Sequence, residues 1–108
     1  MITGVISPND LAALRVILQL YECHICNTAT PSAKRSRQIV EIDFLVVKLS
    51  FFEGATVLTA DDVEHIKMAL GTFIGQARLK VPGSKGRDET VENCERLLTF
   101  FSKTYLQA

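Results

Sequence analysis

The chain has 108 residues, of which 47% are hydrophobic, and its formal net charge at pH 7 is zero. This length is close to the commonest domain size, so we expect one helical domain over residues 1–108. The hydrophobic content excludes a disordered tail. Charge neutrality argues against a nucleic-acid-binding protein that attracts its ligand over the whole surface. Three cysteines without a secretory signal at the start indicate a cytoplasmic protein with reduced thiols, and we expect no membrane span, because no run of 18 apolar residues is present.

The first helix is expected to start at Ser7-Pro8-Asn9-Asp10 and to fade near Cys26-Asn27. Ser7 can cap it, Pro8 suits the first helical position, and Asp10 stands where a capping box places an acid. One apolar face then repeats at spacings of 3 and 4 residues, through Leu11, Leu14, Leu18, Tyr21 and Ile25.

The segment from Ala33 to Gly54 has two interpretations. Apolar and polar residues alternate over Val40–Phe44 and again over Val47–Phe51, which is typical of strands, and residues 40–58 would then form a small sheet in an α+β domain. However, no Gly, Pro or Asn interrupts the segment from Lys34 to Glu53, and a single strand of about 20 residues would exceed the usual range. We favour a helix, with Gly54 just beyond its C-terminus.

Two further helices follow. Thr59 and Asp62 form a capping-box pattern before the third helix, which should end at Pro82-Gly83. Residues 83–87 are predicted to be a flexible basic loop, and the fourth helix should start near Asp88-Glu89. Each of these two helices has one apolar face with spacings of 3 and 4 residues, which we call its seam. The seam of the third helix is Val63, Ile66, Leu70, Phe73 and Ala77, and the seam of the fourth is Val91, Cys94, Leu98, Phe101 and Tyr105. Four helices with short connections predict an all-α, up-down-up-down four-helix bundle, with shallow crossing angles.

The first two helices carry a second apolar stripe. In the first it includes Val16 and Leu20. In the second, Ile39, Ile42, Val46 and Leu49 form one stripe, and Val40, Phe44, Val47 and Phe51 form the other. A helix that is apolar on two sides is buried on two sides. We therefore predict a homodimer interface, which a further protein partner could also use, made of Val16, Leu20, Val40, Phe44, Val47 and Phe51. The alternative is a central second helix that the other three surround.

Gly71 and Gly75 form a GxxxG pattern in the third helix. Each glycine costs about 1 kcal/mol of helix stability. We expect a packing reason for them, namely another helix that passes closely.

Cys23-His24-Ile25-Cys26 is the one motif that suggests a metal or thiol site. A zinc site would need Cys94 and His24 as further ligands. Cys94 occupies a seam position, where a cysteine acts as a small hydrophobe. The metal or redox function is therefore a distant third hypothesis, and we expect no metal and no cofactor.

Other catalytic signals are missing from the sequence. His65 is interpreted as a solvated residue on a charged face. The sequence contains no Walker loop, no GxGxxG and no recognisable catalytic triad, so we do not expect an enzyme.

Basic residues should gather at one end of the bundle, because the start of the second helix and the loop between the last two helices lie at the same end. They are Lys34, Arg35, Arg37, Arg78, Lys80, Lys85 and Arg87. Such an end could contact phosphates, so a nucleic-acid-binding accessory protein is the alternative function, although the net charge does not support it. The main hypothesis remains a small, non-catalytic interaction or structural module.

Overall fold

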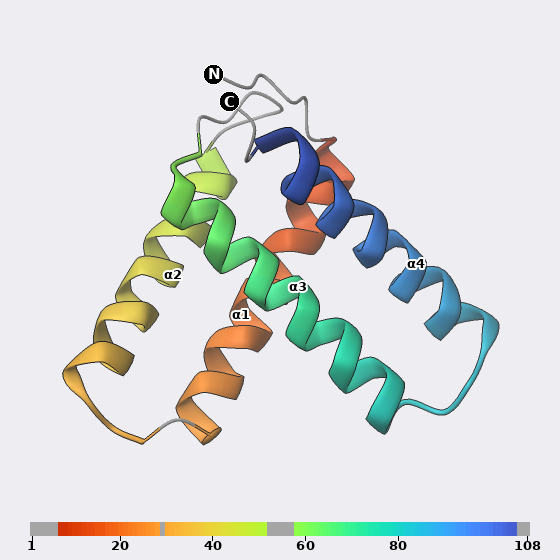
Figure 1. The fold of residues 1–108 in the computed structure, drawn as a ribbon, viewed down its shortest axis with the longest axis horizontal. Helices are drawn as coiled ribbons and strands as arrows, with labels where there is room; N and C mark the ends of the chain where they lie inside the picture. The colour runs from red at the N-terminus through yellow and green to blue at the C-terminus, as the bar shows by residue number, and fades with distance from the viewer. Residues whose placement is uncertain (1–6, 29, 52–57, 106–108) are drawn as a thin grey trace.

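The computed structural model describes residues 7–28, 30–51 and 58–105, and within these residues it contains four α-helices and no strand (Figure 1). Helix α1 spans Pro8–Thr28, α2 spans Ala33–Phe51, α3 spans Ala60–Lys80 and α4 spans Lys85–Phe100. A π-helical turn, η1, continues α4 over Phe101–Tyr105. The predicted all-α class is confirmed, and the alternative sheet is wrong, because residues 40–51 are helical.

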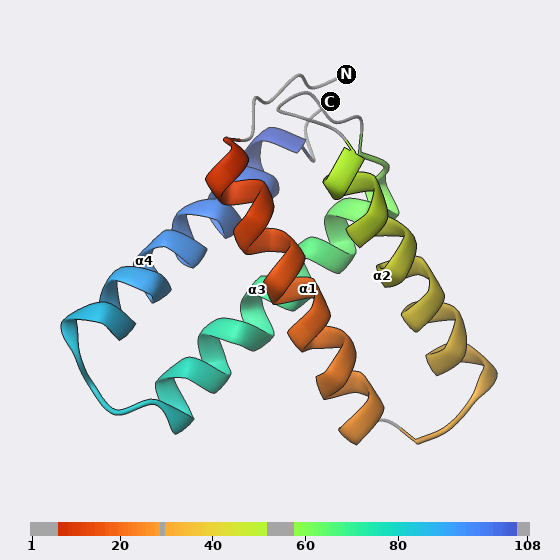
Figure 2. The same ribbon diagram turned by 180° about the vertical axis from the view of Figure 1, so that it is seen from behind.

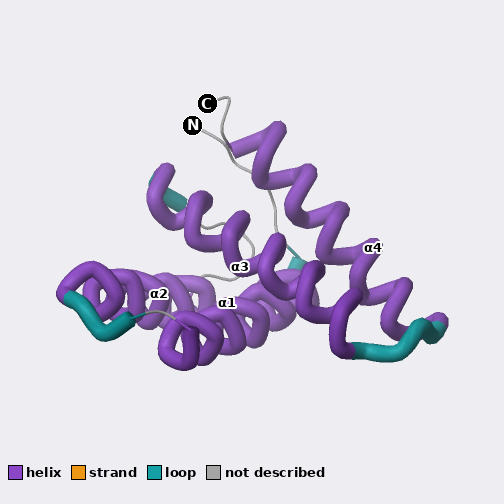
Figure 3. The backbone as a smooth tube through the Cα atoms, turned by 60° about the horizontal axis from the view of Figure 1, so that its bottom comes forward, coloured by secondary structure: helices purple, strands orange, loops and turns teal. Residues whose placement is uncertain are grey.

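Consecutive helices run in opposite directions and form two hairpins, α1–α2 and α3–α4 (Figure 1). The first hairpin lies as one layer, and α3 lies over it (Figure 3). Helices α1 and α3 contact each other and cross as the arms of an X, with α2 and α4 at the outer edges (Figures 1 and 2). The four-helix bundle is thus confirmed, but α1 and α3 do not have the expected shallow crossing. A seam with spacings of 3 and 4 also fits helices that cross at about 50°.

Ser7 and Thr59 cap the starts of α1 and α3, as the sequence predicts. The backbone N–H of Asp10 donates to Oγ of Ser7 at 3.1 Å. At α3, the N–H of Asp62 donates to Oγ1 of Thr59 at 3.1 Å, and the N–H of Thr59 donates to Oδ2 of Asp62 at 3.0 Å, which completes the predicted capping box. The predicted helix end at Gly54 lies outside the described residues.

Helix α4 starts earlier than the sequence suggested. The sequence predicts a start near Asp88, but the helix begins at Lys85. Ser84 accepts a hydrogen bond from the N–H of Arg87 at 3.1 Å, so Ser84 is the N-cap and residues 85–87 form the first turn. The serine cap outweighs the cost of Gly86 in that turn.

The core lies where α1 crosses α3, with one side of α2 and of α4 packed against it. All five predicted core residues of α1 are buried, as are Ile42 and Leu49 of α2. Five buried hydrophobic residues of the described chain lie outside the predicted seams, namely Ile17, Leu45, Ala69, Ile74 and Leu97. A helix that contacts two neighbours on different sides buries a wider arc than one seam. Val40, Phe44 and Val47 of the second apolar stripe of α2 are exposed, so α2 is an edge helix and not a central one.

Candidate functional site: the apolar face of α2

The most exposed apolar surface on α2 consists of Val40, Phe44 and Val47, which we call the α2 face. Phe44 is 71% exposed, and Val40 and Val47 are each 51% exposed. These three residues and Asp43 line a shallow hollow on the outside of the helix. The opposite side of α2 holds the buried Ile42, Leu45 and Leu49, so the helix is apolar on two sides and covered on one.

Position 51 completes the predicted stripe in the sequence. Phe51 is the last residue of α2, but its side chain lies outside the described part of the chain. The α2 face is therefore defined by its other three members.

The second predicted stripe, on α1, lies on a different surface. Nη1 of Arg15 donates to the carbonyl oxygen of Leu49 at 3.3 Å, and Glu22 hydrogen-bonds to Asp43, so this side of α1 faces α2. Leu20 lies about 160° around the helix from Glu22, and Val16 lies about 120° from it. Both are half exposed. The structure therefore distributes the predicted interface residues over two surfaces that do not adjoin.

A pair of carboxyl groups borders the α2 face. Burial, together with the hydrogen bond and the charge of Asp43, raises the pKa of Glu22 to about 7. Ionised Glu22 would be repelled by the charge of Asp43, so Glu22 keeps its proton up to about pH 7. This edge of the α2 face thus changes charge in the physiological range.

His65 was expected to be solvated, and this expectation is wrong. Its side chain is buried between α2 and α3, and its Nε2 lies 2.8 Å from Oε2 of Glu41. Its Nδ1 is buried and has no hydrogen-bond partner among the described residues. His65 has charged neighbours in the sequence, but the packing of α3 against α2 covers its side chain.

The cysteines do not form a metal site in the described residues. Cys23 and Cys26 are exposed near the end of α1, whereas Cys94 is buried in α4. No group of three or more His, Cys, Asp or Glu side chains suited to a metal is present in residues 7–28, 30–51 and 58–105. Burial raises the pKa of the Cys94 thiol, which makes it a poorer nucleophile and ligand.

The basic residues are divided between two corners of the molecule. The start of α2 and the α3–α4 connection lie at the same end of the fold but far apart, at the lower left and lower right of Figure 1. Acidic partners also offset the charges of three of the four residues in the second group, all except Lys80. Arg78 pairs with Glu95, Arg87 with Asp88, and Lys85 with Glu89 at 4.0 Å. The expected single basic end is therefore not formed.

Gly71 and Gly75 are exposed on α3, and a Cβ atom added at either would meet nothing within 4 Å. The expectation that another helix of the fold passes closely is wrong for the described residues. Met68 and Leu79 on the same helix are also exposed, at 47% and 81%.

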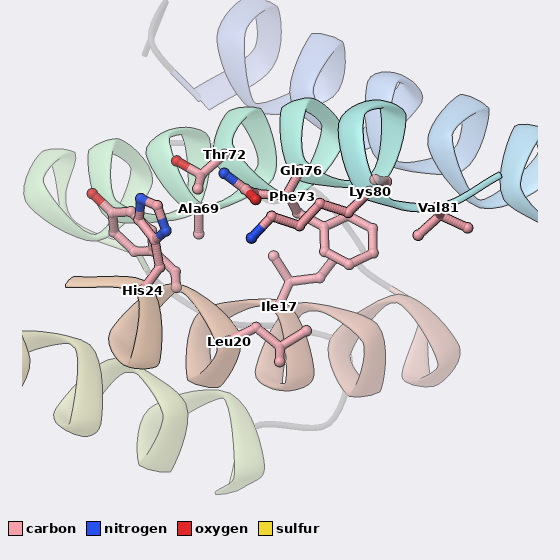
Figure 4. A pocket seen from close by; sticks show the side chains of 11 residues that line it. Ile17, Leu20, His24, Ala69, Thr72, Phe73, Gln76, Lys80 and Val81 are labelled. Atoms are coloured by element: carbon pink, nitrogen blue, oxygen red, sulfur yellow. The ribbon is translucent and has the colours of Figure 1, made fainter. Parts of the chain in front are cut away.

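A groove of about 340 Å³ lies between the C-terminal halves of α1 and α3 (Figure 4). Ile17 and Leu20 form its α1 wall, and Phe73 and Val81 lie on the α3 side. No sequence pattern predicts this groove, because its two walls are far apart in the chain and meet only where α1 crosses α3.

None of the described helices is long and apolar enough to cross a membrane. The chain matches no protein-family model, no curated protein and no solved structure.

Proposed function

We propose that this protein is a non-catalytic interaction module that forms a homodimer through the α2 face. The observation that carries this proposal is the exposure of Phe44, at 71%, between two half-exposed valines on an edge helix. Burying a large apolar side chain contributes about 1.5–3 kcal/mol, and each member of the face appears twice in a symmetric dimer. Exposed apolar clusters on an otherwise charged surface are characteristic of interaction sites.

The arrangement of the face favours a second copy of the chain as the partner. Val40 lies four residues before Phe44, and Val47 lies three residues after it. When two α2 helices pack antiparallel about a twofold axis near Phe44, the two phenyl rings meet, and Val40 of each copy lies opposite Val47 of the other. A twofold interface requires such self-complementarity.

Light scattering and sedimentation equilibrium at micromolar concentrations test the proposal. We expect a concentration-dependent dimer for the natural chain. Phe44→Glu should raise the dissociation constant about a hundredfold or more, because it removes two apolar side chains from the interface and adds two charges. Leu79→Glu is the matched control, since Leu79 is 81% exposed on α3 and should not affect the dimer. A 12.0 kDa monomer at all concentrations would contradict the proposal.

Nucleic-acid binding remains the alternative function, and the distribution of basic residues gives it less support than the sequence did. The basic residues occupy two corners, and three of the four in the second corner are paired with acids. Lys34 and Arg37 are the exposed members of the first corner. Binding of nonspecific DNA that weakens steeply with salt, and that is lost in a Lys34→Gln/Arg37→Gln variant, would favour this alternative over the dimer.

A further inference from the structure

The groove between α1 and α3 has the size and composition of a small-molecule site. Its volume of about 340 Å³ lies at the lower end of the range for ligand pockets, which is about 300–1,000 Å³. Ile17, Leu20 and Phe73 provide an apolar floor and walls (Figure 4). Ligand pockets of this kind combine such walls with a few polar groups that orient the ligand.

The polar groups at the groove are basic or neutral. Lys80 extends back over the groove from the last turn of α3, and His24 projects into it from α1 (Figure 4). No aspartate or glutamate is among the described residues that line it, and Lys80 makes no ion pair within the described part of the chain. The C-terminal end of α3 carries about half a negative charge, which the full charge of Lys80 outweighs.

We propose that this groove binds a small amphipathic monocarboxylate, with its alkyl or aromatic body against Ile17, Leu20 and Phe73 and its carboxylate next to Lys80. The charge at the opening is complementary to an anion, and the walls are complementary to an apolar body. The ammonium group of Lys80 is a single point charge on a flexible stem, so it provides an attraction to the carboxylate without a fixed geometry. The groove does not adjoin the α2 face, so this proposal is independent of the homodimer.

An NMR titration of the ¹⁵N-labelled chain tests the site, with decanoate, decanol and decylamine as probes. We expect saturable shifts that are confined to the C-terminal halves of α1 and α3. Decanoate should bind more tightly than decanol, and decylamine should bind most weakly. A parallel titration with 2-naphthoate distinguishes an aromatic body from an alkyl body. The proposal is overturned by shifts that scatter over the surface, by no saturation at millimolar probe, or by equal affinity for the three alkyl probes.

Two variants and one matched control assign the effect to the groove. Leu20→Glu places an acid in the wall and should abolish decanoate binding. Val16→Glu changes a similarly exposed residue one turn away that does not line the groove, and binding should persist. Lys80→Gln should weaken decanoate about threefold and leave decanol unchanged, as expected for an exposed charge pair. Equal losses in Leu20→Glu and Val16→Glu would overturn the proposal. Titration of Phe44→Glu should give the result of the natural chain whether or not that chain is a dimer.

Discussion

Nε2 of His65 lies 2.8 Å from Oε2 of Glu41, and this hydrogen bond connects α3 to α2 across the two layers. The imidazole is buried, whereas the side chain of Glu41 is 46% exposed. The other ring nitrogen, Nδ1, has no hydrogen-bond partner in the part of the chain that the structure describes. The pair therefore combines one well-satisfied contact with one unsatisfied buried atom, and the two effects can be separated by mutation.

Glu41→Ala should lower the free energy of unfolding by about 1–2 kcal/mol, because it leaves the buried imidazole without its partner. The double variant Glu41→Ala/His65→Leu should recover most of this loss, since it also removes the unsatisfied Nδ1. Urea denaturation of the two variants measures the difference. Glu64→Ala is the control, as Glu64 is exposed and, within residues 7–28, 30–51 and 58–105, makes only an i,i+3 ion pair with Lys67 at 3.5 Å, worth a few tenths of a kcal/mol. A double variant that is less stable than Glu41→Ala would contradict this explanation.

The carboxyl pair of Glu22 and Asp43 predicts that stability falls as the pH rises. The pKa of Glu22 is about 7 in the folded chain and about 4.5 in the unfolded chain. Between these values the unfolded chain releases a proton that the folded chain retains. The unfolding free energy should therefore decrease from pH 4.5 to 7 and stay level above pH 7. Because the site is partly solvated, we expect a decrease of about 1 kcal/mol and not the full linkage value.

Glu22→Gln should remove this decrease and make the chain more stable than the natural one at pH 8, because the amide keeps a hydrogen bond to Asp43 without the repulsion. Urea denaturation from pH 4.5 to 8 measures it. Glu92→Gln, at an exposed position on α4, should keep the natural pH dependence. An unchanged profile in Glu22→Gln would show that the pair does not control this range.

The lowered pKa of Asp62 predicts the opposite pH dependence in the acidic range, namely that the free energy of unfolding falls as the pH falls. Burial alone would raise its pKa, but hydrogen bonds from Lys48 and Thr59 and the charge of Lys48 outweigh burial and lower the pKa below its ordinary value of 3.8. The resulting stabilisation is present above pH 3.8 and is lost as the pH falls through the lower folded value. Asp62→Asn should destabilise the chain by about 1–2 kcal/mol at pH 6, because it weakens the capping box and the contact with Lys48 at 2.8 Å.

Asp61→Asn is the matched control for Asp62, since Asp61 lies in the same first turn of α3 but is exposed. Asp61→Asn removes only the favourable interaction of a carboxylate with the helix dipole, so it should lower the free energy of unfolding by about a few tenths of a kcal/mol. Equal effects of the two substitutions would mean that the capping box and the Lys48 contact add nothing beyond the dipole.

Replacing the exposed Gly71 and Gly75 of α3 with alanine should stabilise the protein. Gly71→Ala and Gly75→Ala should each raise the free energy of unfolding by about 1 kcal/mol, because alanine is the better helix former and its Cβ meets no atom of the described residues within 4 Å. Thermal and urea denaturation measure the gain. Gly86→Ala, in the first turn of α4, is a comparison site where the Cβ is also unobstructed. A loss of stability at Gly71 or Gly75 alone would indicate that this side of α3 is covered in solution.

The sequence by itself determined the helices and their apolar faces. The caps at Ser7 and Thr59 and the seam of α1 follow from local rules, which depend on residues within one or two turns. The same rules identified the second apolar stripe of α2, which the structure leaves exposed at Phe44. They failed at α4, where Ser84 was not recognised as a cap, because a nearby Gly and Pro resemble a loop.

Tertiary structure decided which helix lies against each face. A periodic pattern gives the direction of a face relative to its own helix axis, but it does not give the crossing angle or the neighbour. The steep crossing of α1 and α3 forms the groove between Leu20 and Phe73 and separates the two basic corners, and the packing of α3 against α2 buries His65. For the same reason, the stripes on α1 and α2, which are equivalent in the sequence, lie on surfaces that do not adjoin.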